Sequence, residues 1–404
     1  MKKTLLAAAL LAGFAGVAQA ETSVTLYGII DTGIGYNKLD LPGRTTAAGY
    51  TSPYNHSRVG MINGVQSGSR WGLRGSEDLG GGLKAVFTLE SGFDSGNGNS
   101  AQGGRLFGRQ ATIGLASDSW GQLDFGRQTN IASKYFASID PFGAGFAQAN
   151  IGHGFSAANT NRYDNMVLFQ TPSFSGFQFG IGYSFSTDDT NNGTTTSVAD
   201  TGTGAITSTT AGDRTNFATA DNVRAITAGV RYANGPLQVA LAFDQLNAAN
   251  TLTQAQQDAT PRQYTIGGAY DFEVVKLALA YARTEDGWFA GQGPGAPTGG
   301  VPSALSTSYP TYSFADGFRA SSYLVGLSAP IGGATSLFGS WQRIDPKNDN
   351  LTGGEETSNV FSLGATYDLS KRTNLYAYGS YAKNALFLDD AKSTAVGVGI
   401  RHRF

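Results

Sequence analysis

The sequence predicts an all-β fold, a 16-stranded antiparallel transmembrane β-barrel, from three observations. Many segments of about ten residues alternate apolar with polar or small side chains, the period of two that is typical of β-strands. These segments are even in number, as in bacterial single-chain barrels. The connections between them are short and long in alternation, which a soluble β-sandwich has no reason to show.

The first twenty residues are expected to form a cleaved signal peptide. Lys2 and Lys3 give a positive start, residues 4–17 are apolar, and residues 18–20 are an Ala-Gln-Ala cleavage site. The apolar run is shorter than the roughly 20 residues that a membrane-spanning helix needs. We therefore expect residues 1–20 to be removed and residues 21–404 to form one barrel domain, which can pair its backbone polar groups inside a bilayer.

The composition argues against several classes of protein. There is no Cys, which rules out disulfides and thiolate metal sites, and the three histidines are too widely spaced to indicate a metal centre. The formal net charge of −2 gives no sign of nucleic-acid binding, and loss of Lys2 and Lys3 would make it more negative. We expect neither a cofactor nor a nucleic acid as a partner.

Sixteen segments follow the strand pattern. In residues 82–93, Phe87 and Leu89 share one face, whereas Lys84 and Glu90 share the other and therefore face water. In the last segment Val396, Val398 and Ile400 point outward, while Arg401 and Arg403 point into the lumen. The predicted strands cover 23–36, 68–75, 82–93, 105–117, 121–129, 163–171, 177–187, 223–233, 237–246, 262–272, 274–284, 320–329, 335–344, 358–369, 373–383 and 393–404.

The connections fall into two populations that alternate along the chain. The short ones are residues 76–81, 118–120, 172–176, 234–236, 330–334 and 370–372, and the long ones include 188–222, 285–319 and 345–357. All short turns therefore fall at one end of the barrel and all long loops at the other. This asymmetry is typical of a Gram-negative outer-membrane barrel, with periplasmic turns and extracellular loops.

Four blocks of sequence resemble the Gram-negative general porins, and in particular their β-proteobacterial branch. The blocks are SVTLYG (23–28), SRWGLRGSEDLG (69–80), GRQATIGL (108–115) and WGQLDFGR (120–127). The terminal Phe404 also matches the ending of that family, where it serves as an assembly signal for outer-membrane insertion. The resemblance runs from residue 23 to residue 404 in strand plan, and the long loops carry little of it.

The resemblance implies a water-filled channel for passive diffusion of small ions and hydrophilic solutes. It further implies a homotrimer set in outer-membrane lipid and lipopolysaccharide, with the third long loop of each barrel folded inward. In this chain that loop is residues 130–160. By motif, its acid Asp140 would face a basic wall of Arg70, Arg109 and Arg127.

Strand alternation supports part of this assignment. Arg70 and Arg74 share a face opposite Trp71, so both can line the lumen. Simple alternation instead places Arg109 and Arg127 with apolar neighbours, and a charge on the lipid face costs roughly 2–4 kcal/mol. We therefore expect a bulge, or entry of the strand into the inward loop, at these two positions. Cross-strand pairing or snorkelling of any one arginine is the alternative.

The charge balance predicts an anion-preferring constriction. Its expected members are Arg70, Arg74, Arg105, Arg109 and Arg127, set against Asp140 and Glu90. An outer-membrane enzyme is disfavoured, because none of His56, His153 and His402 lies beside a recognisable nucleophile motif. A solute-specific channel would need aromatic residues along the lumen, whereas these fall mainly on the outward face or in loops. Binding of phage or host surfaces by the long loops stays open.

Overall fold

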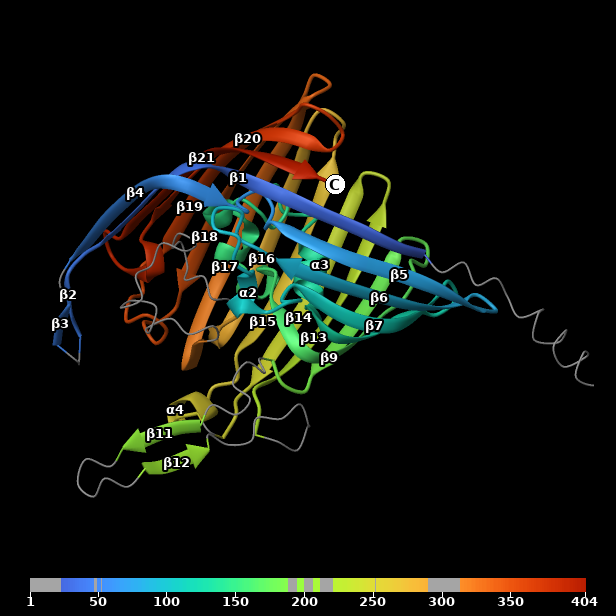
Figure 1. Ribbon diagram of the computed structural model, residues 1–404. Coiled ribbons are helices and arrows are strands. Elements are labelled where there is room, and N and C mark those ends of the chain that lie inside the picture. The colour runs from blue at the N-terminus through green and yellow to red at the C-terminus, as the bar shows by residue number, and fades with distance from the viewer. Residues whose placement is uncertain are drawn as a thin grey trace, which may run out of the picture.

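The computed structural model describes residues 23–46, 49–51, 53–187, 195–199, 206–210, 221–250, 252–289 and 313–404. These residues form a closed antiparallel β-barrel, in which the last strand returns to pair with the first (Figure 1). The expected signal peptide, residues 1–20, and much of the connections 188–222 and 285–319 lie outside the described residues.

Sixteen strand positions make up the wall. They are β1 (Ser23–Leu41), β4 (Tyr54–Asn63) with β5 (Arg70–Gly80), β6 (Leu83–Gly92), β7 (Gln110–Ser117), β8 (Gly121–Thr129), β9 (Arg162–Gln170), β10 (Phe177–Ser184), β13 (Arg224–Asn234), β14 (Leu237–Asn247), β15 (Arg262–Asp271), β16 (Lys276–Trp288), β17 (Ser313–Ile331), β18 (Thr335–Pro346), β19 (Ser358–Asp368), β20 (Thr373–Lys383) and β21 (Lys392–Arg403). Strands β4 and β5 pair with successive stretches of β1 and so occupy one position. The predicted 16-stranded antiparallel barrel is confirmed.

Several strand boundaries differ from the prediction, among them the end of β16 at Trp288 and the start of β17 at Ser313. Residues 54–63, expected to lie in a connection, form β4, and β1 extends to Leu41 to pair with it. The segment predicted to begin at residue 105 begins at Gln110 as β7. The remaining described strands are the short hairpins β2 (Arg44–Thr46) with β3 (Gly49–Thr51) and β11 (Thr195–Ala199) with β12 (Ile206–Thr210).

The described helices are all short. They are α2 (Ala101–Gly104), α3 (Ile131–Phe136), α4 (Gln254–Gln257), η1 (Ala147–Ala149), η2 (Ile151–His153), η3 (Ser156–Ala158) and η4 (Ala385–Phe387). None of these helices has the length and hydrophobicity that a membrane-crossing helix requires. Helix α3 begins where the side chain of Asn130 accepts a hydrogen bond from the backbone N–H of Ser133, a standard N-cap.

The two faces of the wall differ in chemistry. On β21 the outward residues Val396, Val398 and Ile400 are 47%, 57% and 41% exposed, whereas the alternate residues Ser393 and Ala395 are buried. Large exposed apolar residues recur on most other strands, such as Leu26, Ile113, Ile181, Ile266 and Leu363. A continuous apolar band of this kind is stable only against lipid or another protein.

The largest buried apolar cluster joins the β8–β9 connection to the face of the strands that lies opposite the exposed apolar band. Ile131, Tyr135 and Phe136 of α3 pack with small residues such as Ala240 on β14 and Ala278 on β16. Small side chains on these strands leave room for the rings of the connection. The connection is therefore held as firmly as a protein core.

Candidate ion pathway

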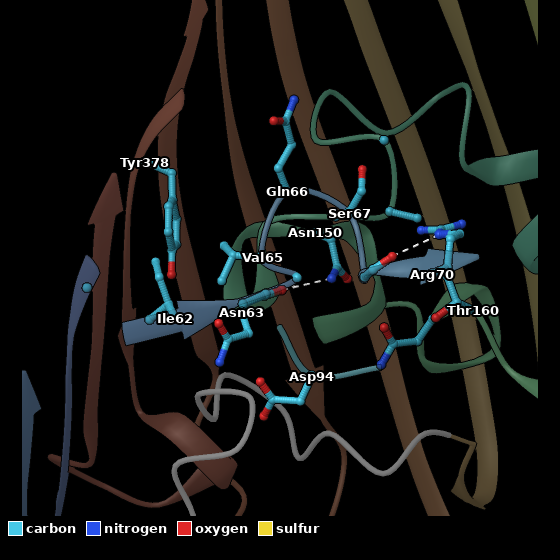
Figure 2. Close-up of a pocket in the computed structure, with 18 of the residues that line it drawn as sticks. Ile62, Asn63, Val65, Gln66, Ser67, Arg70, Asp94, Asn150, Thr160 and Tyr378 are labelled. Atoms are coloured by element: carbon cyan, nitrogen blue, oxygen red, sulfur yellow. Dashed lines mark hydrogen bonds between the residues drawn. The ribbon is translucent and has the colours of Figure 1, made fainter. Parts of the chain in front are cut away.

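A cavity of about 740 Å³ lies where arginine side chains from three parts of the wall meet. Arg70 on β5, Arg109 just before β7 and Arg162 at the start of β9 line it. Residues 58–68 and residues between 143 and 150 line the other sides. Figure 2 shows Arg70 beside Ser67 at this cavity, with Gln66 and Asn150 nearby. One wall of the cavity is thus strongly basic, and the other sides mix polar and apolar residues with the charged Arg58 and Asp94.

Glu90 on β6 is the acidic partner of two of these arginines. Its Oε1 lies 2.7 Å from Nε of Arg109 and 3.9 Å from Nη1 of Arg70. Its Oε2 accepts a hydrogen bond of 3.1 Å from the hydroxyl of Tyr27. Arg70 also donates from Nε to the carbonyl of Gly68 at 2.8 Å. These contacts place Arg70, Arg109 and Glu90 together, as the sequence analysis expected.

Asp164 on β9 is the acidic partner of the other predicted arginines. Its Oδ1 lies 2.6 Å from Nη1 of both Arg105 and Arg127. The Nε of Arg127 donates to the carbonyl of Gly108 at 2.7 Å. Four arginines therefore pair with two carboxylates, and Arg162 lines the cavity beside them, so the cluster carries an excess of positive charge.

The backbone irregularity expected at Arg127 is present, whereas Arg109 shows neither a bulge nor entry into the inward loop. Arg109 precedes β7, which begins at Gln110, so the alternation of that strand does not bind it. At Arg127 the pairing of β8 with β9 shifts between Gly126 and Gln128, and Gly126 has a φ of 117°, a value that favours glycine. Both side chains lie beside an acid, Arg109 at Glu90 and Arg127 at Asp164.

Arg162 and Asp164 are functional residues that the sequence analysis missed. Both lie on β9 two residues apart, the spacing at which side chains of a strand share a face. That spacing was a usable signal. The arginine partners of Asp164 lie 37 and 59 residues away in the sequence, which alternation alone does not reveal.

Of the other predicted lining residues, Arg74, Lys84 and Arg403 are exposed, whereas Arg401 contacts Ser67 at the edge of the cavity. The guanidinium of Arg74 lies 5.4 Å from the ring centre of Tyr27. Arg401 donates to the side chains of Asn374 and Ser67 at 3.0 and 3.1 Å. Phe404 exchanges two backbone hydrogen bonds with Gly28 on β1, at 3.0 and 3.1 Å, so the last residue helps close the barrel. Its role as an assembly signal stays a prediction.

Asp140 does not face the arginines, and this corrects the sequence analysis. Its side chain is 5% exposed and accepts hydrogen bonds from the backbone N–H groups of Phe142, Ala144 and Ile151, at 3.1, 2.9 and 3.1 Å. No ion pair of Asp140 with an arginine occurs among the described residues. The motif correctly located an acid in the loop, but the carboxylate of Asp140 stabilises the loop backbone and does not contact the arginines.

Asp140→Asn is therefore expected to destabilise this loop by about 1–3 kcal/mol, because the amide offers fewer acceptor sites and turns an N–H₂ toward a backbone donor. Ion selectivity should not change. Thermal unfolding and reversal potential of the same purified variant would check both statements. Altered selectivity at unchanged stability would instead return Asp140 to the arginine-facing role.

The same variant should alter the dependence of stability on pH. Burial raises the pKa of Asp140 from 3.8 to about 6, against the opposing effect of its three backbone hydrogen bonds. The folded state therefore binds a proton more tightly than the unfolded chain, and this group makes the loop more stable as pH falls from about 6 to about 4. The amide of the variant has no such proton to bind, so this part of the dependence should disappear.

The described part of the site contains neither a charged histidine nor a group of three or more metal-ligating side chains. His153 of η2 is fully buried, and burial lowers its pKa to about 4, so the ring is neutral at neutral pH. Among the described residues, no group of three or more His, Cys, Asp or Glu side chains could hold a metal ion. The fixed charges of the described cluster are therefore its arginines and carboxylates.

A closed barrel with an apolar outer band and a basic cavity defines a transmembrane pore. The chain belongs to the Gram-negative porin family, whose model matches residues 7–385. It is 72% identical to an outer membrane porin protein of Bordetella pertussis and 31% identical to outer membrane porin protein 32 of Delftia acidovorans, with both chains covered fully in each case. The protein is thus a channel of the Gram-negative outer membrane.

Solved structures agree with this assignment. The anion-selective porin from Comamonas acidovorans is 27% identical and matches 95% of this chain and 100% of its own, with a TM-score of 0.65. Salmonella typhi OmpF, at 17% identity and a TM-score of 0.59, shares the fold and covers 94% of this chain. The family therefore confirms the resemblance found in the sequence.

Proposed function

We propose that this porin is an anion-preferring channel whose pore is narrowed by residues 130–161, folded into the lumen. The observation that carries the proposal is the cluster of five arginines, four of which pair with Glu90 or Asp164 among the described residues. A fixed excess of positive charge at a narrow point attracts anions and repels cations. The guanidinium groups keep their charge at any pH at which the protein works.

The hydrogen bonds of residues 130–161 support their place in the lumen. The segment bonds to Asp244 on β14 at 2.7 Å and to Gln263 on β15 at 2.8 Å. It also bonds to Gln342 on β18 at 3.2 Å and to Ser393 on β21 at 2.6 Å. All four side chains are buried, on the face opposite the apolar band. A segment that reaches strands so far apart around the barrel crosses its interior.

The anion preference has a second line of support. The similar structure from Comamonas acidovorans is that of an anion-selective porin, and it covers nearly the whole of this chain. At 27% identity the selectivity of that protein does not transfer by itself. The described arginine cluster supports the proposed anion preference of this chain independently of that structure.

A reversal-potential measurement tests the proposal. With a gradient of KCl across a planar bilayer, the potential at zero current should have the sign of chloride permeation and exceed the value for an unselective pore. Exchange of chloride for a large organic anion should lower the conductance more than exchange of potassium for a large organic cation. A potential with the sign of potassium permeation would contradict the proposal.

The remaining proposals concern assembly and processing. We infer that the signal peptide is cleaved after residue 20, and that residues 21–404 assemble as a homotrimer in outer-membrane lipid and lipopolysaccharide. The exposed apolar band supports a lipid or subunit contact on the outer face. The relatives are channels, which supports a channel function without enzymatic activity.

A further inference from the structure

The wall has a break between β4 and β5. Strand β4 pairs with residues 32–41 of β1, and β5 pairs with residues 23–29, so that residues 64–69 leave the ladder. We call residues 64–69 the insert. It starts at Gly64, whose φ of 64° turns the chain, and it lines the cavity described above (Figure 2).

Asp31 on β1 holds the insert at both ends and at its centre. Its carbonyl accepts from the N–H of Gly64 at 2.9 Å, and its N–H donates to the hydroxyl of Ser69 at 3.1 Å. Its carboxylate accepts from the N–H of Ser67 at 2.6 Å and from the hydroxyl of Tyr376 at 2.8 Å. Asp31 is fully buried, so each of these bonds is costly to lose.

The insert also reaches two further strands of the wall. The Oε1 of Gln66 accepts from Nδ2 of Asn374 on β20 at 2.9 Å. The hydroxyl of Ser67 accepts from Nη1 of Arg401 on β21 at 3.1 Å. The insert is therefore tied to β1, β20 and β21 at once, and it has one fixed position.

The insert contacts the loop segment 143–147, which we call the loop tip. The N–H of Phe146 donates to the carbonyl of Val65 at 2.5 Å. A Cβ atom placed on Gly145 would overlap the carbonyl oxygen of Gln66, so the two backbones touch. The ring of Phe146 packs against Phe338 and Tyr376, with centroid distances of 5.2 and 5.6 Å.

The loop tip has an unusual backbone that needs such support. Ala144, Phe146 and Ala147 have φ values of 58°, 61° and 49°, in the left-handed region. Each such residue costs roughly 1–2 kcal/mol and persists only where surrounding contacts impose it. The carbonyl of Val65 and the backbone of Gln66 are among the contacts that do so.

We propose that the insert is a second constriction element, which forms one wall of the pore beside the arginines and fixes the position of the loop tip. This inference rests on the proposed inward position of residues 130–161. It assigns pore size to two elements that meet, Val65 with Phe146 and Gln66 with Gly145, rather than to the loop alone. Substitutions in the insert should then change conductance without any change in the arginines.

Cysteine labelling tests whether the insert borders the ion path. The chain has no Cys, so Ser67→Cys introduces the sole thiol. Labelling with a methanethiosulfonate reagent that carries a sulfonate should lower the single-channel current in steps. The sulfonate reagent should react about 10-fold or more faster than its trimethylammonium counterpart, because the positive cluster concentrates anions. Ser119→Cys, in the exposed turn 118–120, is the matched control and should be labelled without a change in current.

Gly145→Ala tests the contact between insert and loop tip. The added methyl should push the tip away from Gln66 and change both conductance and its fluctuations, while the variant still migrates as a folded barrel. Gly333→Ala, in a turn where a Cβ meets no atom within 4 Å, should leave all three properties unchanged.

The outcomes separate this inference from the function on which it rests. If the Ser67→Cys channel conducts but its current is insensitive to labelling, or if no reagent reaches the introduced thiol, the insert is not a constriction element and the channel function stands. A wild-type pore of unrestricted conductance, with no sign of a constriction, would overturn the inward loop and the insert together.

Discussion

Arg70→Ala is expected to weaken the anion preference of the channel about five-fold and to raise its single-channel conductance. The change removes one of the five positive charges of the arginine cluster, and one of the three of them that line the cavity, while Glu90 and Asp164 stay. A charge several ångströms from a passing ion is worth on the order of 1 kcal/mol after screening, which corresponds to a factor of about five. The lost guanidinium also widens the cavity that it lines. Reversal potential and conductance of one purified variant measure the two effects.

Arg74→Ala is the matched control for this prediction. Arg74 lies on the same strand and face as Arg70, about 13 Å further along at the usual rise per residue. It is exposed, stacks over Tyr27 and is not among the described residues that line the cavity. Its loss should change selectivity much less. Equal effects of the two variants would remove Arg70 from the narrow part of the pore, and a lower melting temperature with unchanged selectivity would make it a structural cross-strand partner.

The wall was predictable from the sequence because lipid and water impose opposite demands on alternate residues. Strand β21 shows the full effect, with Val398 outward and exposed and Ala395 inward and buried. Strand β4 was missed because it lacks these two contrasting environments. It pairs with β1 alone among the described strands, and most of its residues, including Val59 and Met61, are exposed. A strand that does not have one face in lipid and the other packed inside needs no alternation of apolar and polar residues.

The site was predictable only where strand geometry decides it. Arg70 follows from alternation, and the cost of a charge in lipid correctly indicated irregular backbone at Arg127, whereas Arg109 simply precedes its strand. Asp140 was misplaced because a motif fixes the position of an acid in the chain, whereas the direction of its carboxylate depends on the backbone N–H groups that the folded loop presents. Asp31 escaped notice because its partners in the insert belong to a break in the ladder that no periodicity announces.

Asp164→Ala is expected to reduce stability by about 3–5 kcal/mol and to strengthen the anion preference. One carboxylate oxygen of Asp164 serves both Arg105 and Arg127 at 2.6 Å, and the side chain is only 9% exposed. The substitution leaves two partly buried guanidinium groups without this carboxylate. Removing one partner of a buried ion pair is strongly destabilising, because the other charge stays buried without it. The substitution also raises the net positive charge of the cluster by one. Thermal unfolding and reversal potential, again on one preparation, measure the two effects.

Two companion variants make this prediction specific. Asp164→Asn keeps the volume and one acceptor oxygen, so it should show the same shift in selectivity with a smaller loss of stability. Asp118→Ala, which removes an exposed acid in the turn between β7 and β8, should change neither property measurably. The sign of the selectivity change decides the mechanism. If the cluster acts through its field, Arg70→Ala and Asp164→Ala must shift the reversal potential in opposite directions, although both remove side-chain volume near the pore. A shift in the same direction for both would mean that pore width, and not the arginine field, sets the selectivity.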